Sequence, residues 1–252
     1  MTSLTDLHAL LKRLKLGGLA PTLPERLALA RRDHLDYVAF LEMLLLDEVT
    51  RRDQRRLDLR LERAGFDGVC RLDDFDWTAP LTVDRRMLDE VFSLRFLDNH
   101  DNVVFVGPVG VGKTFLAQAL GYAAARGGHS VSFIRADALF KTFNQARADH
   151  SFDKTMRRYL VPDLLIVDDF GLRRLSSQES ADLYALIVER HRHASLAITS
   201  NRGIDEWLGL FDDPILGNSA LDRLANASYQ IVMEGPSYRA RLAPHRRLDA
   251  MV

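Results

Sequence analysis

The sequence predicts an α/β protein in which a parallel five-stranded sheet, covered by helices on both faces, follows a small all-helical N-terminal domain. Three observations predict this fold class. From residue 102 onward, short apolar runs alternate with helical segments, which is typical of parallel sheets with right-handed crossovers. Before residue 66, apolar residues recur at the three- and four-residue spacing of helix faces. A glycine-rich turn directly follows the first apolar run of the second part.

The N-terminal part is predicted to be helical from Leu4 to about Phe66. A first helix ends at the glycine pair of positions 17 and 18, and its apolar face consists of Leu4, Leu7, Leu11 and Leu14. A longer helix with Gly65 as its C-cap follows, and its apolar face consists of Tyr37, Phe40, Leu41, Leu44 and Leu45. In the next segment we expect a loop at residues 73–77 and a helix over residues 83–97.

Five strands are predicted in the second part, at Val103–Val106, Val131–Ile134, Leu164–Val167, Leu196–Thr199 and Gln230–Met233. The helices between them begin near Lys113, Asp137 and Ser176, and Ser176 with Glu179 fits a capping box. We therefore expect a helical domain over residues 1–66, a joining region over 67–100, the α/β core over 101–235 and a short basic tail over 236–252.

Composition excludes several classes of protein. The chain is 47% hydrophobic and 27% charged, as is ordinary for a globular protein, and no apolar run approaches the roughly 20 residues of a membrane span. Its single cysteine, Cys70, cannot form an intrachain disulfide, and the N-terminus lacks the order of a signal peptide. We expect a cytoplasmic protein that makes no membrane contact.

The formal net charge of −1 means that a nucleic acid would have to be held by a local basic patch. Six arginines lie between residues 51 and 63, interleaved with Asp53, Asp58 and Glu62. Two interpretations stay open. The interleaved acids favour an ion-paired, solvated helix face, whereas the arginine count also suits a surface that follows nucleic-acid phosphates.

The glycine-rich turn, GPVGVGKT, matches the phosphate-binding loop G-x-x-x-x-G-K-[ST] at each fixed position. Such a loop turns its backbone N–H groups inward at a helix N-terminus, which creates an anion site. We expect Lys113 to bind the β- and γ-phosphates of ATP and Thr114 to bind Mg²⁺. The expected nucleotide-binding residues are Gly107, Pro108, Val109, Gly110, Val111, Gly112, Lys113, Thr114 and Phe115.

Two adjacent carboxylates follow the apolar run at 164–167. Ligands of α/β sheets bind at the carboxyl ends of the strands, so Asp168 is expected to hold Mg²⁺ or its water. Hydrolysis also needs a group that activates or orients the attacking water, and Asp169 is expected to do this.

Two further polar residues are candidates for the same site. Asn201 follows the strand at 196–199, where its amide could hydrogen-bond the attacking water or the γ-phosphate. Arg223 lies in a helical segment and has two interpretations, a surface ion pair with Asp222 or Asp213, or an arginine finger offered to the nucleotide of a neighbouring subunit.

Together these motifs resemble the IstB-like family of AAA+ ATPases, which assist the transposases of bacterial insertion sequences and are related to DnaC-type helicase loaders and to DnaA. The resemblance covers nearly the whole chain. Its core blocks are GPVGVGKTFLAQALG, PDLLIVDDFG, ITSN, DPILGNSALDRL and GPSYR. Its N-terminal blocks are LKRLKLGGLAPTLPERLALA, FLEMLLLDEVTRRDQRRLDLRLERAGF and DDFDW.

The resemblance implies an AAA+ core with a particular order of strands. The strand ending in TSN lies in the middle, between the phosphate-loop strand and the strand that ends in the two carboxylates. Lys113 and Thr114 match the Walker A residues, Asp168 the Walker B metal ligand, Asn201 sensor 1 and Arg223 the arginine finger. The family usually has Glu where this chain has Asp169. A reduced or absent lid is expected, because little chain follows residue 233. Arg239, in the SYR block of the tail, is a candidate for a residue position that the family shares.

The implied function is a DNA-binding ATPase that forms homo-oligomers on double-stranded DNA, with ATP between subunits, and recruits or stimulates the transposase of the same insertion sequence. The alternative is a DnaC-type loader whose N-terminal helices bind a replicative helicase. A small-molecule kinase and an ATP-gated binding module that does not hydrolyse ATP are further alternatives.

Overall fold

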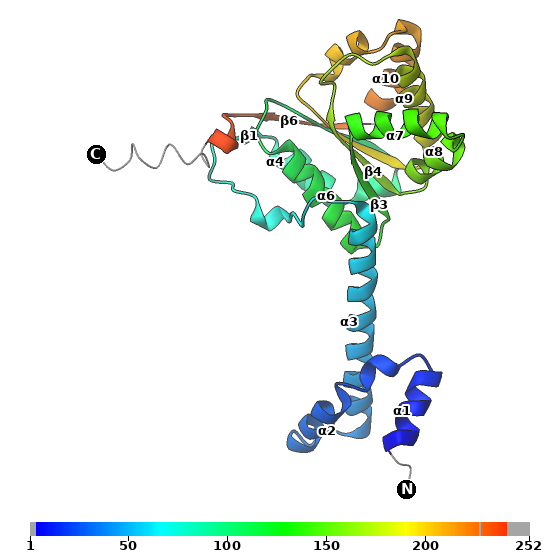
Figure 1. Ribbon diagram of the computed structural model, residues 1–252. Coiled ribbons are helices and arrows are strands. Elements are labelled where there is room, and N and C mark those ends of the chain that lie inside the picture. Colours follow the sequence, from blue (N-terminus) through cyan, green and yellow to red (C-terminus); the bar gives the residue numbers. More distant parts are fainter. Residues whose placement is uncertain (1–3, 227, 241–252) are drawn as a thin grey trace. The chain divides into compact units, whose positions relative to one another are not determined.

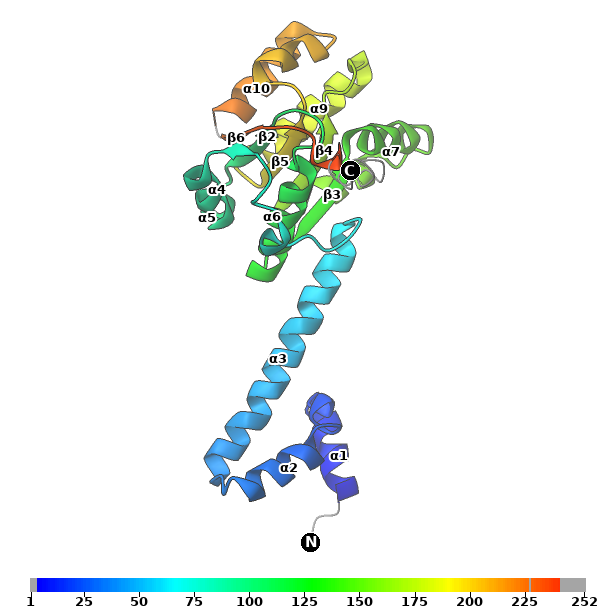
Figure 2. The ribbon, with the colours of Figure 1, turned by 90° about the vertical axis from the view of Figure 1, so that its left-hand side faces the viewer.

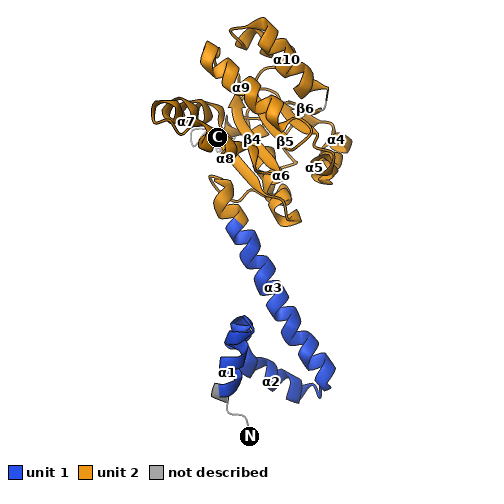
Figure 3. Ribbon diagram, turned by 90° about the vertical axis from the view of Figure 1, so that its right-hand side faces the viewer, with its two compact units in different colours: residues 1–59 blue, residues 60–252 orange. Residues whose placement is uncertain are grey.

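The structure, a computed structural model, describes residues 4–226 and 228–240. It divides the chain into two compact units, residues 1–59 and 60–252 (Figures 1 and 3). The division falls inside α3 (Tyr37–Ala64), the longest of the described helices. Most of the expected basic tail, from residue 241 onward, lies outside the described residues.

The N-terminal unit is a small helical assembly. It contains α1 (Leu4–Arg13), the 3₁₀ turn η1 (Gly17–Leu19), α2 (Leu23–Arg32) and most of α3. One face of α3 supplies Phe40 and Leu44 to a small apolar cluster with Leu19 and Leu23. Of the two apolar faces predicted from the sequence, this cluster takes up Leu11, Phe40 and Leu44, whereas the other described members are exposed, namely Leu7, Leu14, Tyr37, Leu41 and Leu45.

Ion pairs supplement this small core. Arg26 binds the Asp47 carboxylate through Nε at 2.6 Å and Nη2 at 2.9 Å. Glu48 is 3% exposed and accepts hydrogen bonds from Arg51 and Arg52. Farther along α3, Arg56 pairs with Asp53 at 3.2 Å. Ion pairing within α3 therefore engages several arginines of the basic run, as the solvated-face interpretation expects.

Glu48 makes the N-terminal unit sensitive to acid. Its two arginine partners lower the pKa of the Glu48 carboxyl from 4.5 to about 2. Because the folded pKa lies below the unfolded one, the interaction stabilises the fold above pH 4.5 and is lost as the pH falls toward 2. We expect Glu48→Gln to lower the thermal midpoint, measured by circular dichroism, at pH 6 and to lower it progressively less below pH 4.5.

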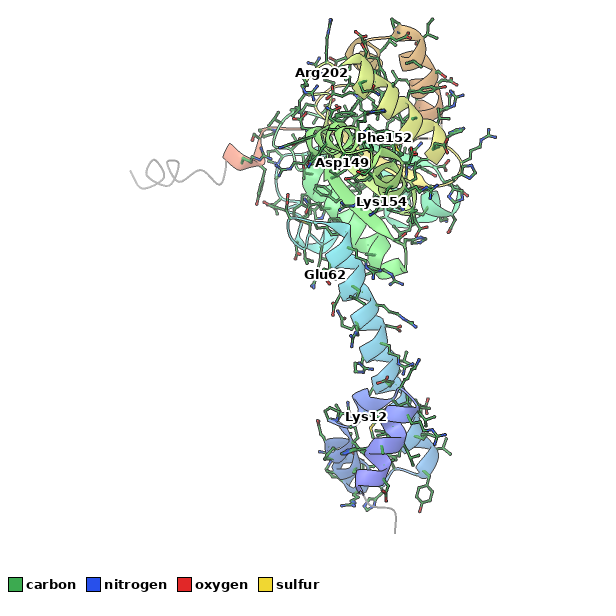
Figure 4. The ribbon with its side chains drawn as sticks, turned by 45° about the vertical axis from the view of Figure 1, so that its right-hand side comes forward. Lys12, Glu62, Asp149, Phe152, Lys154 and Arg202 are labelled. Carbon is green, nitrogen blue, oxygen red and sulfur yellow. The ribbon has the colours of Figure 1, made fainter. Side chains whose placement is uncertain are left out.

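The matched control is Glu62→Gln on the same helix, since Glu62 projects from α3 as an exposed side chain (Figure 4). This control should leave the midpoint unchanged across the same pH range. An equal effect of Glu48→Gln at every pH would contradict the linkage.

A six-stranded sheet forms the centre of the second unit, in the order β1-β6-β2-β5-β4-β3. The strands are β1 (Thr82–Val83), β2 (Asn102–Val106), β3 (Val131–Arg135), β4 (Leu164–Phe170), β5 (Ser195–Ser200) and β6 (Ser228–Glu234). All five predicted strands form and pair in parallel, and β2 lies beside β5, which lies beside β4. The order expected from the family resemblance is thereby confirmed.

The predicted strand number was wrong by one, because β1 adds an antiparallel edge strand beside β6. Two residues are too short to produce a recognisable alternation, so β1 falls at the start of the helix expected over 83–97. That helix is also divided. Asp84 caps α4 (Arg85–Phe92), and Leu94, with a φ of 66°, separates it from α5 (Arg95–Asp98).

Helices cover both faces of the sheet (Figure 2). On one face α6 (Lys113–Gly127) packs across β2, β3, β4 and β5. On the other face lie α7 (Ala136–Ala148), α8 (Phe152–Leu160), α9 (Ser177–Arg190) and α10 (Pro214–Ala225). Alternate residues of β4 explain this arrangement, since Leu165 and Val167 join the second face's core while Leu164 and Ile166 are also fully buried. In the described part of the chain, no helix is long and apolar enough to cross a membrane.

Candidate nucleotide-binding site

The loop between β2 and α6 has the backbone of a phosphate-binding turn. Gly110 and Gly112 have φ values of 85° and 101°, in the left-handed region that only glycine adopts readily. A Cβ at Gly107 would collide with the carbonyl oxygen of Met233 on β6. These glycines therefore allow both the turn of the loop and its close approach to the neighbouring strand.

Lys113, the first residue of α6, folds back over the loop. Its side chain is 6% exposed, and Nζ donates to the carbonyl oxygens of Gly107 at 2.8 Å and Pro108 at 2.7 Å. A third hydrogen bond, of 2.6 Å, reaches Oδ1 of Asn201 beyond the end of β5. The structure thus brings together two predicted site residues that lie 88 positions apart.

A β-bulge separates the two carboxylates of β4. Val167 pairs with Ile198, but Phe170 pairs with Ser200, so three steps along β4 oppose two steps along β5. The additional residue is accommodated at Asp169, whose φ is 55°. Aspartate is among the few residues that enter this left-handed region at modest cost. Asp169 is half-buried and lines the adjacent cavity, whereas Asp168 is 1% exposed.

Thr199 of β5 holds the bulge in place. Its Oγ1 accepts a 2.9 Å hydrogen bond from the backbone N–H of Asp169 and donates one of 2.5 Å to Oδ1 of Asp168. Thr199 is expected from the sequence to lie beside the carboxylate strand, but no role for its hydroxyl is predicted. The preceding apolar strand could have indicated one, because a hydroxyl at a buried strand end must find polar partners.

Asp168 and Thr114 form an oxygen donor pair suited to Mg²⁺. Oγ1 of Thr114 donates to the Asp168 carboxylate at 2.9 Å and 3.2 Å. In the described residues, no group of three or more His, Cys, Asp or Glu side chains is arranged to hold a metal. Mg²⁺ typically uses one or two protein oxygens together with substrate phosphates, so this donor pair at the end of the phosphate loop fits that ion.

Burial shifts both central charges toward their neutral forms. It raises the pKa of Asp168, although hydrogen bonds from Thr199 and Thr114 act in the opposite direction. Burial also lowers the pKa of Lys113, opposed by the negative charges of Asp169 and Asp168. A cation beside Asp168 and phosphates beside Lys113 would favour the charged forms again.

A cavity of about 440 Å³ opens directly over the phosphate loop. Its lining includes residues Val109–Phe115 of the loop and α6, among them Lys113 and Thr114. Asp169 and Asn201 also line it. Two further segments contribute to it, residues 74–81 before β1 and residues 236–239 after β6. This size and this mixed apolar and charged lining suit a nucleotide.

The first of these segments was missed as part of the site, and in the second only Arg239 was named from the sequence. Phe75 packs against Phe115 of α6 with ring centroids 5.5 Å apart, and Tyr238 donates its backbone N–H to the carbonyl of Gly110 at 2.9 Å. Arg239 is exposed and lines the same cavity. The aromatic residues of DDFDW were the feature of the sequence that could have indicated the first segment. Their place at the site could not be predicted, because it depends on long-range contacts with α6.

Four predicted site residues are absent from the lining of this cavity. Gly107, Pro108 and Asp168 hydrogen-bond to the lining residues Lys113 and Thr114, whereas Arg223 has no such bond among the described contacts. It lies on α10, where its Nη1 donates to the backbone carbonyl and the hydroxyl of Ser219 at 2.7 Å and 2.6 Å. One interpretation of Arg223 was an ion pair with Asp222 or Asp213. Among the described contacts its guanidinium instead bonds to Ser219, one turn earlier on α10.

The hydroxyl of Thr199 yields a direct test of the bulge. Thr199→Val preserves the shape of the side chain but leaves the Asp169 N–H without its acceptor and removes one of the two hydroxyl donors to Asp168, so that only Thr114 still donates to it. We expect the turnover number for ATP to fall by about ten-fold or more, since both carboxylates lose their support. Thr199→Ser, which keeps the hydroxyl, should retain most of the rate. Equal losses in the two variants would contradict this role.

The parallel sheet, the glycine-rich loop at the start of α6 and the carboxylate at the end of β4 define a P-loop nucleotide-binding protein. Residues 9–245 match the family described as IstB-like ATP binding protein. The chain belongs to this family. It is 43% identical to a putative ATP-binding protein in an insertion sequence of Mycobacterium tuberculosis, over 94% of both chains. It is 34% identical to the insertion sequence IS21 putative ATP-binding protein of Pseudomonas aeruginosa, over 94% of this chain and 89% of that one.

Solved structures agree on the fold. The crystal structure of DnaI is similar with a TM-score of 0.55 and 18% identity, covering 65% of this chain and 90% of that chain. The crystal structure of the DnaC helicase loader gives a TM-score of 0.51 and 22% identity over 58% of this chain and 86% of that chain. The α/β core therefore shares its fold with these two structures.

Proposed function

We propose that this protein is a DNA-dependent ATPase that assists the transposase of its insertion sequence. ATP would bind over the phosphate loop, and subunits would assemble on duplex DNA with ATP at their contacts. The observation that carries the proposal is a pair of hydrogen-bonded groups at the cavity, Lys113 with Asn201, and Asp168 with Thr114 and Thr199. Relatives encoded by insertion sequences, matched over nine-tenths of the chain, support the transposition context.

Each residue of this set has a proposed role. Lys113 would exchange its contacts with the loop carbonyls for phosphate oxygens, while Asn201 orients the attacking water or the γ-phosphate. Thr114 and Asp168 would hold Mg²⁺, which neutralises charge on the phosphates. Asp169, aimed into the cavity by the bulge, would accept the proton of the attacking water. Arg239 would place a second cation of the same subunit at the rim.

Arg223 is proposed to act on the nucleotide of a neighbouring subunit. Its absence from the cavity lining of its own subunit favours a role in trans, and AAA+ proteins of the resembled family use such an arginine. Mixing two inactive variants tests this role. Arg223→Ala keeps an intact cavity, and Asp169→Asn keeps the arginine, so a mixed oligomer contains complete sites where the two kinds of subunit meet.

We expect each variant alone to be inactive and the mixture to regain phosphate release in the presence of duplex DNA. Random mixing in equal amounts would complete about one site in four. Arg223→Lys is the control that keeps the positive charge but replaces the planar, bidentate guanidinium by an ammonium group. It should restore little activity. Full activity of Arg223→Ala by itself, or no recovery in the mixture, would contradict a finger that acts in trans.

The DNA contacts are proposed to come from arginines of α3 and the tail. Because Arg51, Arg52 and Arg56 already pair with carboxylates of the same helix, Arg55 and Arg63 are better placed to contact phosphates first. Binding of labelled duplex at low salt should weaken when both are replaced by glutamine. A helicase loader would instead capture a replicative helicase, so a pull-down with helicase and transposase side by side separates the two functions.

A further inference from the structure

Past the two carboxylates, the end of β4 and the residues after β5 are joined by a second group of hydrogen bonds. Oγ of Ser200 donates to the carbonyl oxygen of Phe170 at 2.9 Å and accepts a 3.1 Å hydrogen bond from the backbone N–H of Arg202. Nε of Arg202 donates in turn to the carbonyl oxygen of Gly171 at 2.8 Å. These three hydrogen bonds, called the bracket below, have no part in the roles proposed above for the nucleotide site.

The bracket encloses both residues that are proposed to act on the attacking water. Asp169 directly precedes Phe170, and Asn201 lies between Ser200 and Arg202. The pairing of β4 with β5 ends at Phe170 and Ser200, so the Arg202 side chain extends the connection one residue beyond the paired strands. The spacing between Asp169 and Asn201 therefore depends on this side chain.

Arg202 is itself held by a buried tryptophan. Trp207 is 1% exposed and donates from Nε1 to the carbonyl oxygen of Arg202 at 3.1 Å. The same indole packs edge-on against Phe170, with ring centroids 4.7 Å apart. Gly171 has a φ of 84°, which glycine adopts readily, and a Cβ there would come within 3.6 Å of Cδ of Arg202. One buried side chain thus supports both sides of the bracket, and a glycine allows their close approach.

A surface ion pair is the other interpretation of Arg202. Its Nη1 lies 3.6 Å from Oε2 of Glu206, and the two side chains are 46% and 52% exposed. Exposed pairs of this kind contribute little to stability, because water and salt screen them. The bond from Nε to the Gly171 carbonyl is shorter and reaches the loop that follows another strand, so it constrains the site whereas the ion pair does not.

Nucleotide binding increases the importance of the bracket. Oδ1 of Asn201 accepts a 2.6 Å hydrogen bond from Nζ of Lys113. When Lys113 turns to the phosphates, as proposed above, Asn201 gives up this bond and its position depends on its chain neighbours. Proton transfer to Asp169 requires that the carboxylate and the Asn201 amide contact the same water, and small displacements of such groups cost much of the rate. A constraint outside the cavity can retain this alignment.

We propose that Arg202 is a positioning residue for ATP hydrolysis, which holds Asn201 at a fixed spacing from Asp169 through its bond to the Gly171 carbonyl. The inference rests on the proposed ATPase function. Arg202 acts through its neighbours, because it is absent from the lining of the nucleotide cavity.

Arg202→Met removes the donor and keeps the aliphatic stem. We expect its turnover number for ATP to fall by about ten-fold or more, while its affinity for ADP stays unchanged. A complex of ADP, Mg²⁺ and aluminium fluoride, which imitates the phosphoryl group during transfer, should bind about ten-fold more weakly to the variant. Arg202→Lys, which keeps a donor on a stem of similar length, should recover most of both losses.

A double-variant cycle separates positioning from general support of the fold. An Asn201→Ala chain has no amide to position, so adding Arg202→Met should change turnover and analogue affinity by about two-fold or less. Glu206→Gln is the matched control, because it removes the ion pair but keeps an acceptor for the backbone N–H of Gly203. This control should turn over ATP at the wild-type rate.

Four results would overturn the positioning role. They are wild-type turnover in Arg202→Met, an equal loss in Glu206→Gln, an equal weakening of ADP binding, and losses that multiply with those of Asn201→Ala. The analogue also distinguishes this inference from the proposed function. If the wild-type chain released no phosphate, the ATPase function would fail alone. Weaker analogue binding by Arg202→Met would then still support positioning, and equal binding would overturn it.

Discussion

Asp169→Asn is expected to abolish ATP turnover while ATP binding survives. The substitution removes the charge that would accept the proton of the attacking water, and losses of about 100-fold or more in turnover number are usual for such a group. Phosphate release measures the first quantity, and a fluorescent ATP analogue measures the second. The expected separation is a large fall in turnover with a nearly constant dissociation constant.

The backbone at position 169 makes this variant informative. With a φ of 55°, the position tolerates Asn about as well as Asp, so the bulge should persist and only the charge changes. Asp169→Glu is the matched control, because it keeps the carboxylate and extends it by one methylene toward the cavity. We expect it to keep or raise the rate. If Asp169→Asn turned over ATP normally, the second carboxylate of β4 would not be the catalytic group.

Arg190→Met is expected to produce the largest loss of stability. The Arg190 side chain at the end of α9 is 1% exposed, and burial lowers its pKa to about 10. Its guanidinium donates to five backbone carbonyls, those of Tyr159, Leu160, Pro162, Asp163 and Ser195. It thereby ties the end of α8 to the starts of β4 and β5. Removing it takes a donor from all five carbonyls, including the buried bonds to Tyr159 and Ser195, although the Asp163 carbonyl keeps the N–H of Ser195, so we expect a loss of about 3–5 kcal/mol.

Urea unfolding followed by tryptophan fluorescence measures the free energy of unfolding of the second unit, which contains Arg190. The chain has two tryptophans, Trp77 and Trp207, and both lie in the second unit. Arg126→Met, an exposed arginine in the last turn of α6, is the control and should change the free energy of unfolding by about 0.5 kcal/mol or less. A similar small effect of Arg190→Met would show that water or relaxation satisfies the carbonyls.

The arrangement of the core could be predicted because its signals are local. Each parallel strand is an apolar run, and the glycine-rich loop has fixed positions that few chance sequences satisfy. The order of β2, β5 and β4 came from the family resemblance, since no local pattern specifies which parallel strands are neighbours. Strand β1 escaped prediction because two residues carry no periodicity.

The details of the site depend on contacts between distant residues. The bulge at Asp169 arises from the register of β4 against β5, and neither strand reveals it alone. The hydrogen bond from Lys113 to Asn201 joins the start of α6 to the residue after β5, and the support of both carboxylates by Thr199 joins β5 to β4. Sequence could therefore name Asp168 and Asp169 as a pair, but only the fold explains why one is buried beside Thr114 and the other faces the cavity.

Steady-state phosphate release by the wild-type chain tests the central claim most directly. The assay compares ATP with Mg²⁺, ATP with EDTA, and ATP with Mg²⁺ and duplex DNA at low salt. We predict hydrolysis that requires Mg²⁺ and rises with duplex DNA. Tight ATP binding without phosphate release, with or without DNA, would contradict the account and leave the protein as an ATP-gated binding module.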